Sequence, residues 1–582
     1  MKPIPEWHEK ISQPVHEQIS TELDVTIPMR DGVLLSADVH RPDAEGQFPA
    51  LIAFQPWGKD HDAFGLHFPR QRRPSPLWDG ALESGDTRYL VARGYVHIIV
   101  DARGTGHSGG ELTGVFGAGG KGEGQDIHDI VEWLAEQPWC DGNVGMVGIS
   151  YLAAVQLLAA AEQPPHLKAI FPEGGHYDTY RHVYHGGILW QMPRAAMRGR
   201  GGDSGMAVAN PFSFTRRRVG DEKFNALLEQ KLRDPDIHYH PNYHQLLRYP
   251  ELDPIWLDYI INDVDGWFWQ GEGTLEERLA KVEIPVHLGV QIGRGWQMDE
   301  TIHAFNGLNV PKQIAIRPGP PMQERPFNEF HDEIVRWYDH WLKGNDTGML
   351  DEPPIQVHVQ GSNEVRYFDQ WPVPETQWTK LFLRPGGRLT QDPEGLDALD
   401  APPDGYYQAP ERVTSQVSRL VYETLAFEQD VDLIGPAALN LWAEIDTDDT
   451  NWILTVSDVA PDGSEMKMTT GWLKASHREV YEGLSEPWAP YHPHTRAVPV
   501  PAGEVIEYAI RVYPMTHRVR TGHRLRLEIK STEAEQSVDV MLPPESAHLN
   551  SGRATTHKVY RDRDQPSHLI LPVVPTERKD QG

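Results

Sequence analysis

The sequence predicts an α/β domain with a parallel sheet and a helical insertion, followed by an all-β domain, and three patterns lead to this prediction. Strands alternate with helices over residues 21–176 and 266–345, which is typical of a parallel sheet covered on both faces. Residues 177–265 instead combine His, Arg, Tyr and Trp at helical spacing, which indicates an inserted helical cap. Residues 346–582 carry short alternating or apolar segments between turn residues, the pattern of a β-sandwich or jelly roll.

The individual elements are expected in the following order. Residues 1–20 form an appended arm, and a hairpin follows around Met29-Arg30-Asp31-Gly32, because Asp-Gly supplies the positive φ of a tight turn. The first domain continues with strands 49–54, 95–100, 144–147, 285–290 and 313–316 and helices 126–136, 151–161 and 328–343. The β domain is expected to contain strands 355–359, 380–383, 439–444, 452–459, 505–512 and 523–529.

Size and charge limit the class of protein. The 582 residues exceed the ~250–300 at which one hydrophobic core usually stops growing, so two or three domains are expected. With 54 Lys and Arg against 84 Asp and Glu, the net charge of −30 repels nucleic acid and anionic membranes. The single Cys140 can close no intramolecular disulfide, the first residues form no apolar signal core, and no apolar run reaches about 18 residues. We therefore expect a cytoplasmic protein without a membrane span, whose partner is a small-molecule substrate.

A nucleophile elbow is predicted around Ser150. The segment 143–154 has the pattern of a buried strand, a sharp turn and the start of a helix, with the serine at the turn. Gly148, Ala153 and Ala154 supply the small side chains that a strained elbow needs on both sides of its nucleophile. Ser150 would then project its hydroxyl above the sheet, where backbone N–H groups can hold a developing oxyanion. The alternative interpretation is that Ser150 only caps the helix.

Through these residues the chain resembles the family of cocaine esterase and X-prolyl dipeptidyl peptidases, whose elbow has the sequence Gly-x-Ser-Tyr-x-Gly. Gly148, Ser150 and Tyr151 match it. Further motifs extend the resemblance over nearly the whole chain, at 29–32, 101–110, 336–344, 435–436 and 520–525. The resemblance implies an α/β-hydrolase fold with an inserted helical cap and a C-terminal jelly-roll domain. It also implies hydrolysis of an ester or amide through an acyl-serine without metal or organic cofactor, and self-association through the β domain.

The usual partners of such a serine are absent from the positions that the resemblance implies. The family's acid follows the strand corresponding to 285–290, but here Gln291-Ile292-Gly293-Arg294 contains no acid, and the first to appear is Asp299. The family's histidine follows the next strand, where an ungapped alignment places Pro321. Because a serine hydroxyl needs a base to remove its proton, the usual mechanism would require other residues.

Three interpretations remain open. His331, at the start of the helix 328–343, can serve as the base, with Asp299 or Asp332 orienting it. His176 is the second candidate, because its loop 171–178 follows the next strand and offers both an imidazole and carboxylates. In the third interpretation Ser150 attacks nothing, and the fold binds a small molecule or performs lyase or isomerase chemistry.

Two groups are expected to stabilise the oxyanion. The backbone N–H of Tyr151 is the first donor. The resembling family places a tyrosine of a Pro-Tyr pair as the second donor, and this chain has Pro56-Trp57, so the indole N–H of Trp57 takes that role. We therefore predict a serine hydrolase or acyl transferase that acts on a small ester, lactone or amide.

Two other motifs carry weaker predictions. Gly104-Thr105-Gly106-His107-Ser108-Gly109 follows a strand and matches the dinucleotide fingerprint, although the loop of the resembling family explains it equally. The spacing of His238, His240 and His244 is compatible with a metal site, but solvated histidines of a helical cap explain it better.

Overall fold

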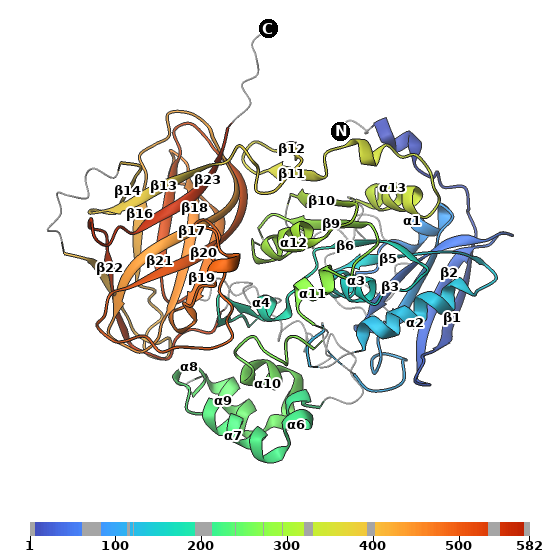
Figure 1. Cartoon of the computed structure of the whole chain (residues 1–582), viewed down its shortest axis with the longest axis horizontal. Coiled ribbons are helices and arrows are strands. Elements are labelled where there is room, and N and C mark those ends of the chain that lie inside the picture. Colours follow the sequence, from blue (N-terminus) through green and yellow to red (C-terminus); the bar gives the residue numbers. More distant parts are fainter. Residues whose placement is uncertain are drawn as a thin grey trace, which may run out of the picture.

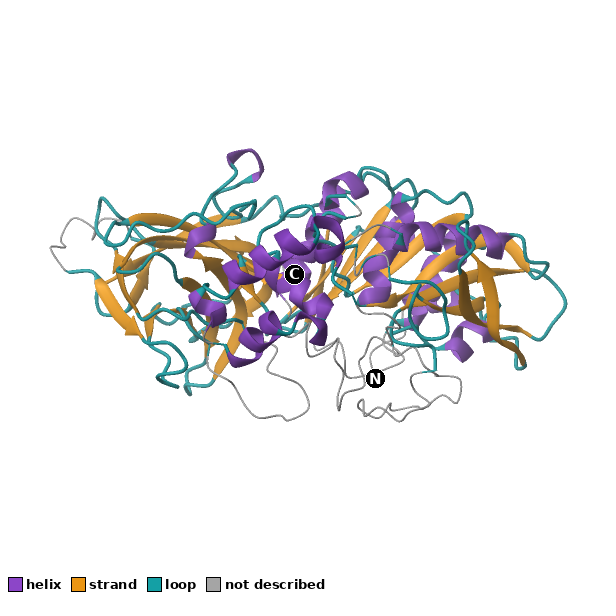
Figure 2. Cartoon of the chain, turned by 90° about the horizontal axis from the view of Figure 1, so that it is seen from below, coloured by secondary structure: helices purple, strands orange, loops and turns teal. Residues whose placement is uncertain are grey.

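The computed structural model describes an α/β unit and an all-β unit that lie side by side, with a group of helices below their junction (Figure 1). The described residues are 6–60, 83–112, 114, 117–119, 122–191, 212–238, 240–271, 273–293, 295–318, 330–392, 402–533 and 548–575. Viewed from below, the strands gather at the two ends of the molecule, and the cap helices lie in front of the junction (Figure 2).

The described part of the α/β unit is built on one sheet of ten strands. In spatial order they are β1 (Ile19–Pro28), β2 (Leu34–Pro42), β4 (Val96–Asp101), β3 (Phe48–Gln55), β5 (Cys140–Ile149), β6 (Leu167–Glu173), β9 (Val286–Gln291), β10 (Lys312–Arg317), β11 (Ile355–Val359) and β12 (Glu364–Phe368). The strands from β4 to β11 are parallel to their neighbours, and antiparallel strands complete both edges. The hairpin of β1 and β2 confirms the turn predicted at Asp31-Gly32, where Gly32 has φ 84°.

Helices pack on this sheet and hold its central strands. They are α1 (Thr87–Ala92), α2 (Glu123–Ala135), α3 (Tyr151–Ala161), α11 (Leu275–Leu279), α12 (Gly295–Gly307) and α13 (His331–Trp341). α3 is largely apolar, and ten of its eleven residues are buried. Tyr338 of α13 lies over Gly145 of β5, where an added Cβ would be 2.4 Å from the ring. The missing side chain therefore allows α13 to approach the sheet closely.

The segment predicted to form the cap is largely helical over its described residues. After β7 (Tyr184–His185) and β8 (Ile188–Leu189), its helices are α6 (Phe214–Val219), α7 (Asp221–Lys231), α8 (Pro235–His238), α9 (Pro241–Arg248) and α10 (Pro254–Ile261), while α4 (Thr179–Val183) precedes them at the junction. The buried carboxylate of Asp258 accepts hydrogen bonds from Ser213 Oγ and Phe214 N. This contact joins the N-terminus of α6 to α10.

Over its described residues, the all-β unit forms a sheet of eleven strands around its own hydrophobic core. In spatial order they are β15 (Asp404–Gln408), β22 (Thr555–Tyr560), β17 (Val431–Ile445), β20 (Ile506–Val519), β19 (Glu465–Lys474), β18 (Asn451–Val459), β21 (Arg524–Lys530), β16 (Arg419–Glu423), β14 (Arg388–Thr390), β13 (Gln377–Arg384) and β23 (His568–Val574). β23 pairs with both β13 and β17, so the sheet closes on itself.

One expected strand belongs to the other unit. The sequence assigns 355–359 to the β domain, but the structure pairs this segment as β11 in parallel with β10, with Ile314 opposite Ile355. The first sheet therefore continues through β12, beyond the predicted boundary at residue 345. The strand alternates buried and half-buried residues, a pattern that suits the outer part of either sheet, so local periodicity could not assign it.

The described part of the N-terminal arm packs on α13. His8 Nε2 lies 2.7 Å from a carboxylate oxygen of Asp332, and Ser12 Oγ donates to Asp339 at 2.8 Å. Within the described ranges, none of the helices combines the length and apolar character needed to cross a membrane.

Candidate active site

Ser150 stands at a strained turn between β5 and α3. Its φ of 61° and ψ of −116° lie outside the regions that residues with a side chain normally adopt. Gly148 has φ 140°, and a Cβ there would lie 2.4 Å from Leu152 Cβ, so this position tolerates only glycine. Ser150 occupies the N-cap position of α3, yet among the described residues no side-chain hydrogen bond from it caps the helix. The strain therefore has another use than capping.

The neighbourhood of the elbow includes both expected oxyanion donors. Tyr151 begins α3, its ring is buried, and its hydroxyl donates to Glu123. The ring of Trp57 meets that of Tyr151 edge to face at 6.2 Å. In this structure the Trp57 indole N–H donates to the carboxylate of Glu83 at 3.3 Å, so it is held by that group. The sequence did not single out Glu83, whose backbone oxygen also accepts the N–H of Ile149 at 3.1 Å.

His331 is buried at the start of α13, but the structure does not join it to an acid as expected. Its Nε2 accepts the backbone N–H of Asp86 at 3.1 Å, and its ring stacks on Tyr89 at 4.9 Å. Asp332 instead contacts His8, as described for the arm, and Asp299 pairs with Arg511 of the all-β unit at 2.7 Å. Burial lowers the pKa of His331 to about 3, so its imidazole is a weak proton acceptor.

His176 occupies the loop between β6 and α4 and is also buried. Its ring stacks on His182 at 3.9 Å, with the ring planes 14° apart. Burial lowers its pKa to about 3 as well. The loop continues through Tyr177 and Asp178, whose backbone N–H groups donate to the buried carboxylate of Glu300 at 3.0 and 3.4 Å.

The strands that precede the family's acid and histidine end here in Gln291 and Arg317. Both side chains point to Glu173, the last residue of β6: Gln291 Nε2 lies 3.1 Å from one carboxylate oxygen, and Arg317 Nε lies 3.3 Å from the other. Glu173 is fully buried, and this burial raises its pKa to about 7. The sequence places Glu173 in the loop after β6 but assigns it no role, because its partners are 118 and 144 residues away. Pro321 lies outside the described residues.

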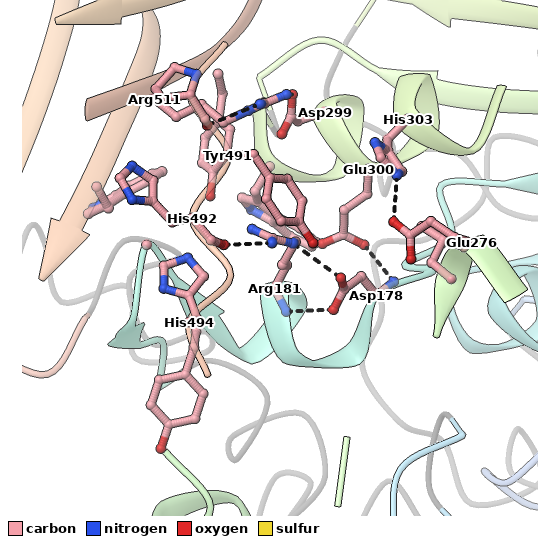
Figure 3. Close-up of a pocket in the computed structure, with 17 residues that line it drawn as sticks. Asp178, Arg181, Glu276, Asp299, Glu300, His303, Tyr491, His492, His494 and Arg511 are labelled. Carbon is pink, nitrogen blue, oxygen red and sulfur yellow. Dashed lines mark hydrogen bonds and ion pairs between the residues drawn. The ribbon is translucent and has the colours of Figure 1, made fainter. Parts of the chain in front are cut away.

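A separate polar pocket lies between α4, α11, α12 and the all-β unit (Figure 3). Asp299 contributes to it through its ion pair with Arg511, and Arg181 pairs with Asp178 and donates to the backbone oxygen of His492 at 2.8 Å. Among the described residues that line this pocket, the elbow serine does not occur. This pocket therefore lies at the junction of the two units and is distinct from the elbow.

The two weaker motifs have structural explanations. The loop 104–109 wraps around the buried carboxylate of Asp101, which accepts the backbone N–H groups of Lys59 and His107 at 2.7 and 2.8 Å. A Cβ on Gly106 would lie 2.1 Å from that carboxylate, so glycine is required by the protein's own acid. His240 accepts the N–H of Tyr243 at the start of α9, and no group of three or more potential metal ligands occurs among the described residues.

Comparison with known proteins agrees with this architecture. The family model of X-Pro dipeptidyl-peptidase (S15 family) matches residues 31–321, and that of the X-Pro dipeptidyl-peptidase C-terminal non-catalytic domain matches residues 347–570. Cocaine esterase from Rhodococcus sp. (strain MB1 Bresler) is 24% identical over 619 residues, which cover 95% of this chain and 99% of the relative.

Solved structures agree in fold. A CocE/NonD family hydrolase from Staphylococcus aureus has a TM-score of 0.72 at 22% identity, covering 96% of this chain and 94% of the other. An α-amino acid ester hydrolase has a TM-score of 0.72 at 18% identity, covering 98% of each chain. The chain thus belongs to the S15 family of X-Pro dipeptidyl-peptidases, and it is a hydrolase with an α/β-hydrolase core and a C-terminal β domain.

Proposed function

We propose that this protein hydrolyses a small ester by transferring its acyl group to Ser150. The strained backbone of Ser150 is the observation that carries the proposal, because a serine is held in such a conformation where its hydroxyl must stand clear of the sheet. The relatives named as cocaine esterase and α-amino acid ester hydrolase support an ester rather than the lyase or isomerase alternative.

The elbow supplies the oxyanion site in this proposal. The backbone N–H of Tyr151, at the N-terminus of α3, donates to the oxygen that becomes negative when Ser150 Oγ attacks. Trp57 becomes the second donor when its indole N–H leaves Glu83 and turns to the substrate. A carboxylate that competes for this donor would make the oxyanion site weaker in the free enzyme than in the complex.

We also propose the finer features of the architecture. The closed strand order of the all-β unit supports a jelly roll, and we place its start after β12 rather than at residue 346. The substrate is a small molecule that enters next to the cap, and copies of the chain associate through the β domain. The single Cys140, which can close no intramolecular disulfide, supports a location in the cytoplasm.

The test is labelling with a fluorophosphonate, read by the intact mass of the protein. We expect wild type to gain one phosphonyl group and Ser150→Ala to gain none, while Ser108→Ala, which removes a buried hydroxyl elsewhere in the core, is labelled as wild type. A folded wild type that is not labelled would contradict the proposed function. Labelling that persists in Ser150→Ala would place the nucleophile at another residue.

A further inference from the structure

The ends of four neighbouring strands bring polar side chains to the level of the elbow. β5 ends at Ile149, immediately before Ser150, and the next three strands of the sheet end at Glu173, Gln291 and Arg317. Ile149 is paired with Glu173, and Gln291 is paired with Arg317. Because paired residues of parallel strands have their side chains on the same face, these strand ends form one layer beside the serine.

Neighbouring residues bind the carboxylate of Glu173 and leave space for it. Gln291 and Arg317 donate to its two oxygens, as described above. Gly289, which pairs with Glu173 across β6 and β9, leaves the space, because a Cβ there would lie 1.6 Å from Oε2 of the carboxylate. The carboxylate therefore occupies the volume of a missing side chain and is held at both oxygens.

The backbone of Glu173 is also hydrogen-bonded to the nucleophile. The N–H of Ser150 donates to the carbonyl oxygen of Glu173 at 3.1 Å. The side chain of Glu173 lines a small cavity together with Gly148 and Ile149, the two residues that precede the serine. Glu173 therefore lies directly beside the residues that position the nucleophile.

The charges around Glu173 set its proton affinity. Burial raises its pKa to about 7, Arg317 opposes this rise, and Glu333 of α13 adds to it, because Glu333 shares the Arg317 guanidinium at 2.7 Å. Two other titratable groups face it: Tyr177, whose pKa is raised by burial and then by Glu173, and His331, which lines the same cavity. A proton acceptor is most useful when its pKa lies near the working pH, a condition that the weakly basic His331 does not meet.

We propose that Glu173 accepts the proton of Ser150 through water and so replaces the missing histidine. As Ser150 Oγ bonds to the ester carbonyl carbon, its proton passes to the Glu173 carboxylate and the carbonyl oxygen becomes the oxyanion. The oxyanion then collapses, the ester C–O bond breaks, and the alcohol leaves with that proton. Water then attacks the acyl-serine carbonyl carbon and gives a proton to Glu173. As the second oxyanion collapses, the bond from Ser150 Oγ to the acyl carbon breaks, Oγ takes the proton from Glu173, and the carboxylic acid leaves.

This inference rests on the proposed function, and one set of variants tests both. The assay is the pH dependence of kcat/KM with p-nitrophenyl acetate, after subtraction of the rate of Ser150→Ala. For wild type we expect kcat/KM to rise with pH through an apparent pKa of about 7. Glu173→Gln should lose this rise together with about 100-fold or more of the rate, while Glu173→Asp should keep a rise at a reduced rate.

Glu333→Gln is the matched control, because it removes the other carboxylate on Arg317. Loss of this like charge should lower the pKa of Glu173, so the rise moves to lower pH while its plateau is retained. This variant keeps the test decisive if Glu173→Gln does not fold, as judged by circular dichroism. A wild-type pH profile in folded Glu173→Gln, or an unmoved profile in Glu333→Gln, would overturn the inference alone. Absence of Ser150-dependent phosphonylation in wild type would overturn the proposed function, and the inference with it.

Discussion

Replacing the elbow serine by glycine should make the protein more stable while removing its activity. A residue in a sparsely populated backbone conformation such as that of Ser150 costs of order 1–3 kcal/mol. Glycine removes that strain. It also increases the conformational entropy of the unfolded chain, which lowers the free energy of unfolding by about 0.4–1 kcal/mol. Ser150→Gly should therefore exceed Ser150→Ala in free energy of unfolding by roughly 0.5–2 kcal/mol, because alanine keeps the strained Cβ.

The difference can be measured by urea denaturation followed through tryptophan fluorescence. With slopes of about 1–3 kcal/mol per molar urea, the midpoint of Ser150→Gly should lie roughly 0.2–2 M above that of Ser150→Ala. Ala153→Gly is the matched control, since it introduces glycine into the first turn of the same helix without relieving strain and should cost about 1 kcal/mol. A midpoint of Ser150→Gly at or below that of Ser150→Ala would refute the view that the elbow stores strain for its nucleophile.

Three further predictions concern the surroundings of the site. Tyr338→Phe removes a hydroxyl that accepts a hydrogen bond from Met146 N at 3.2 Å and donates one to Met146 O. Urea denaturation should show that the free energy of unfolding falls by about 1–3 kcal/mol. The control Tyr367→Phe, at an exposed ring, should leave it unchanged. His331 has a pKa of about 3 in the folded protein, below the 6.5 of the unfolded chain, so its contribution to stability is present above pH 6.5 and is lost as pH falls toward 3. Between pH 7 and pH 5 the wild type should lose about 2 kcal/mol relative to His331→Asn, and parallel pH curves of the two proteins would exclude the buried neutral imidazole. Arg511→Ala breaks the contact with Asp299 between the two units and should lower the free energy of unfolding by about 1 kcal/mol. Hydrogen exchange of α12 should then accelerate. Exchange as slow as in wild type would show that this ion pair does not stabilise the junction.

Local patterns were sufficient to predict much of the fold. The helix 151–161 begins and ends where its small and apolar residues predict, and the hairpin at Asp31-Gly32 follows from turn chemistry alone. The elbow could be found because its constraints, a glycine two residues before the serine and small residues after it, lie within one short segment. Motifs distributed along the chain likewise predicted the family to which it belongs.

The partners of Ser150 depend on contacts that local patterns do not encode. From the sequence, Asp299 was a candidate for the acid that orients His331. In the structure, α12 directs this carboxylate to Arg511, which is 212 residues away in the other unit. The strand 355–359 was assigned to the wrong unit for a related reason, since its alternation does not specify which sheet it joins.

The sequence by itself determined the elbow, the alternation of strands and helices in the first unit, and the absence of an acid and a histidine at their expected places. Only the tertiary structure decided what stands there instead. β6 and β9 are neighbours in the sheet although the whole cap separates them in the chain, so the layer of Glu173, Gln291 and Arg317 exists only after these strands have paired. Periodicity records which face of a strand is buried, whereas long-range pairing and register decide which side chains meet there.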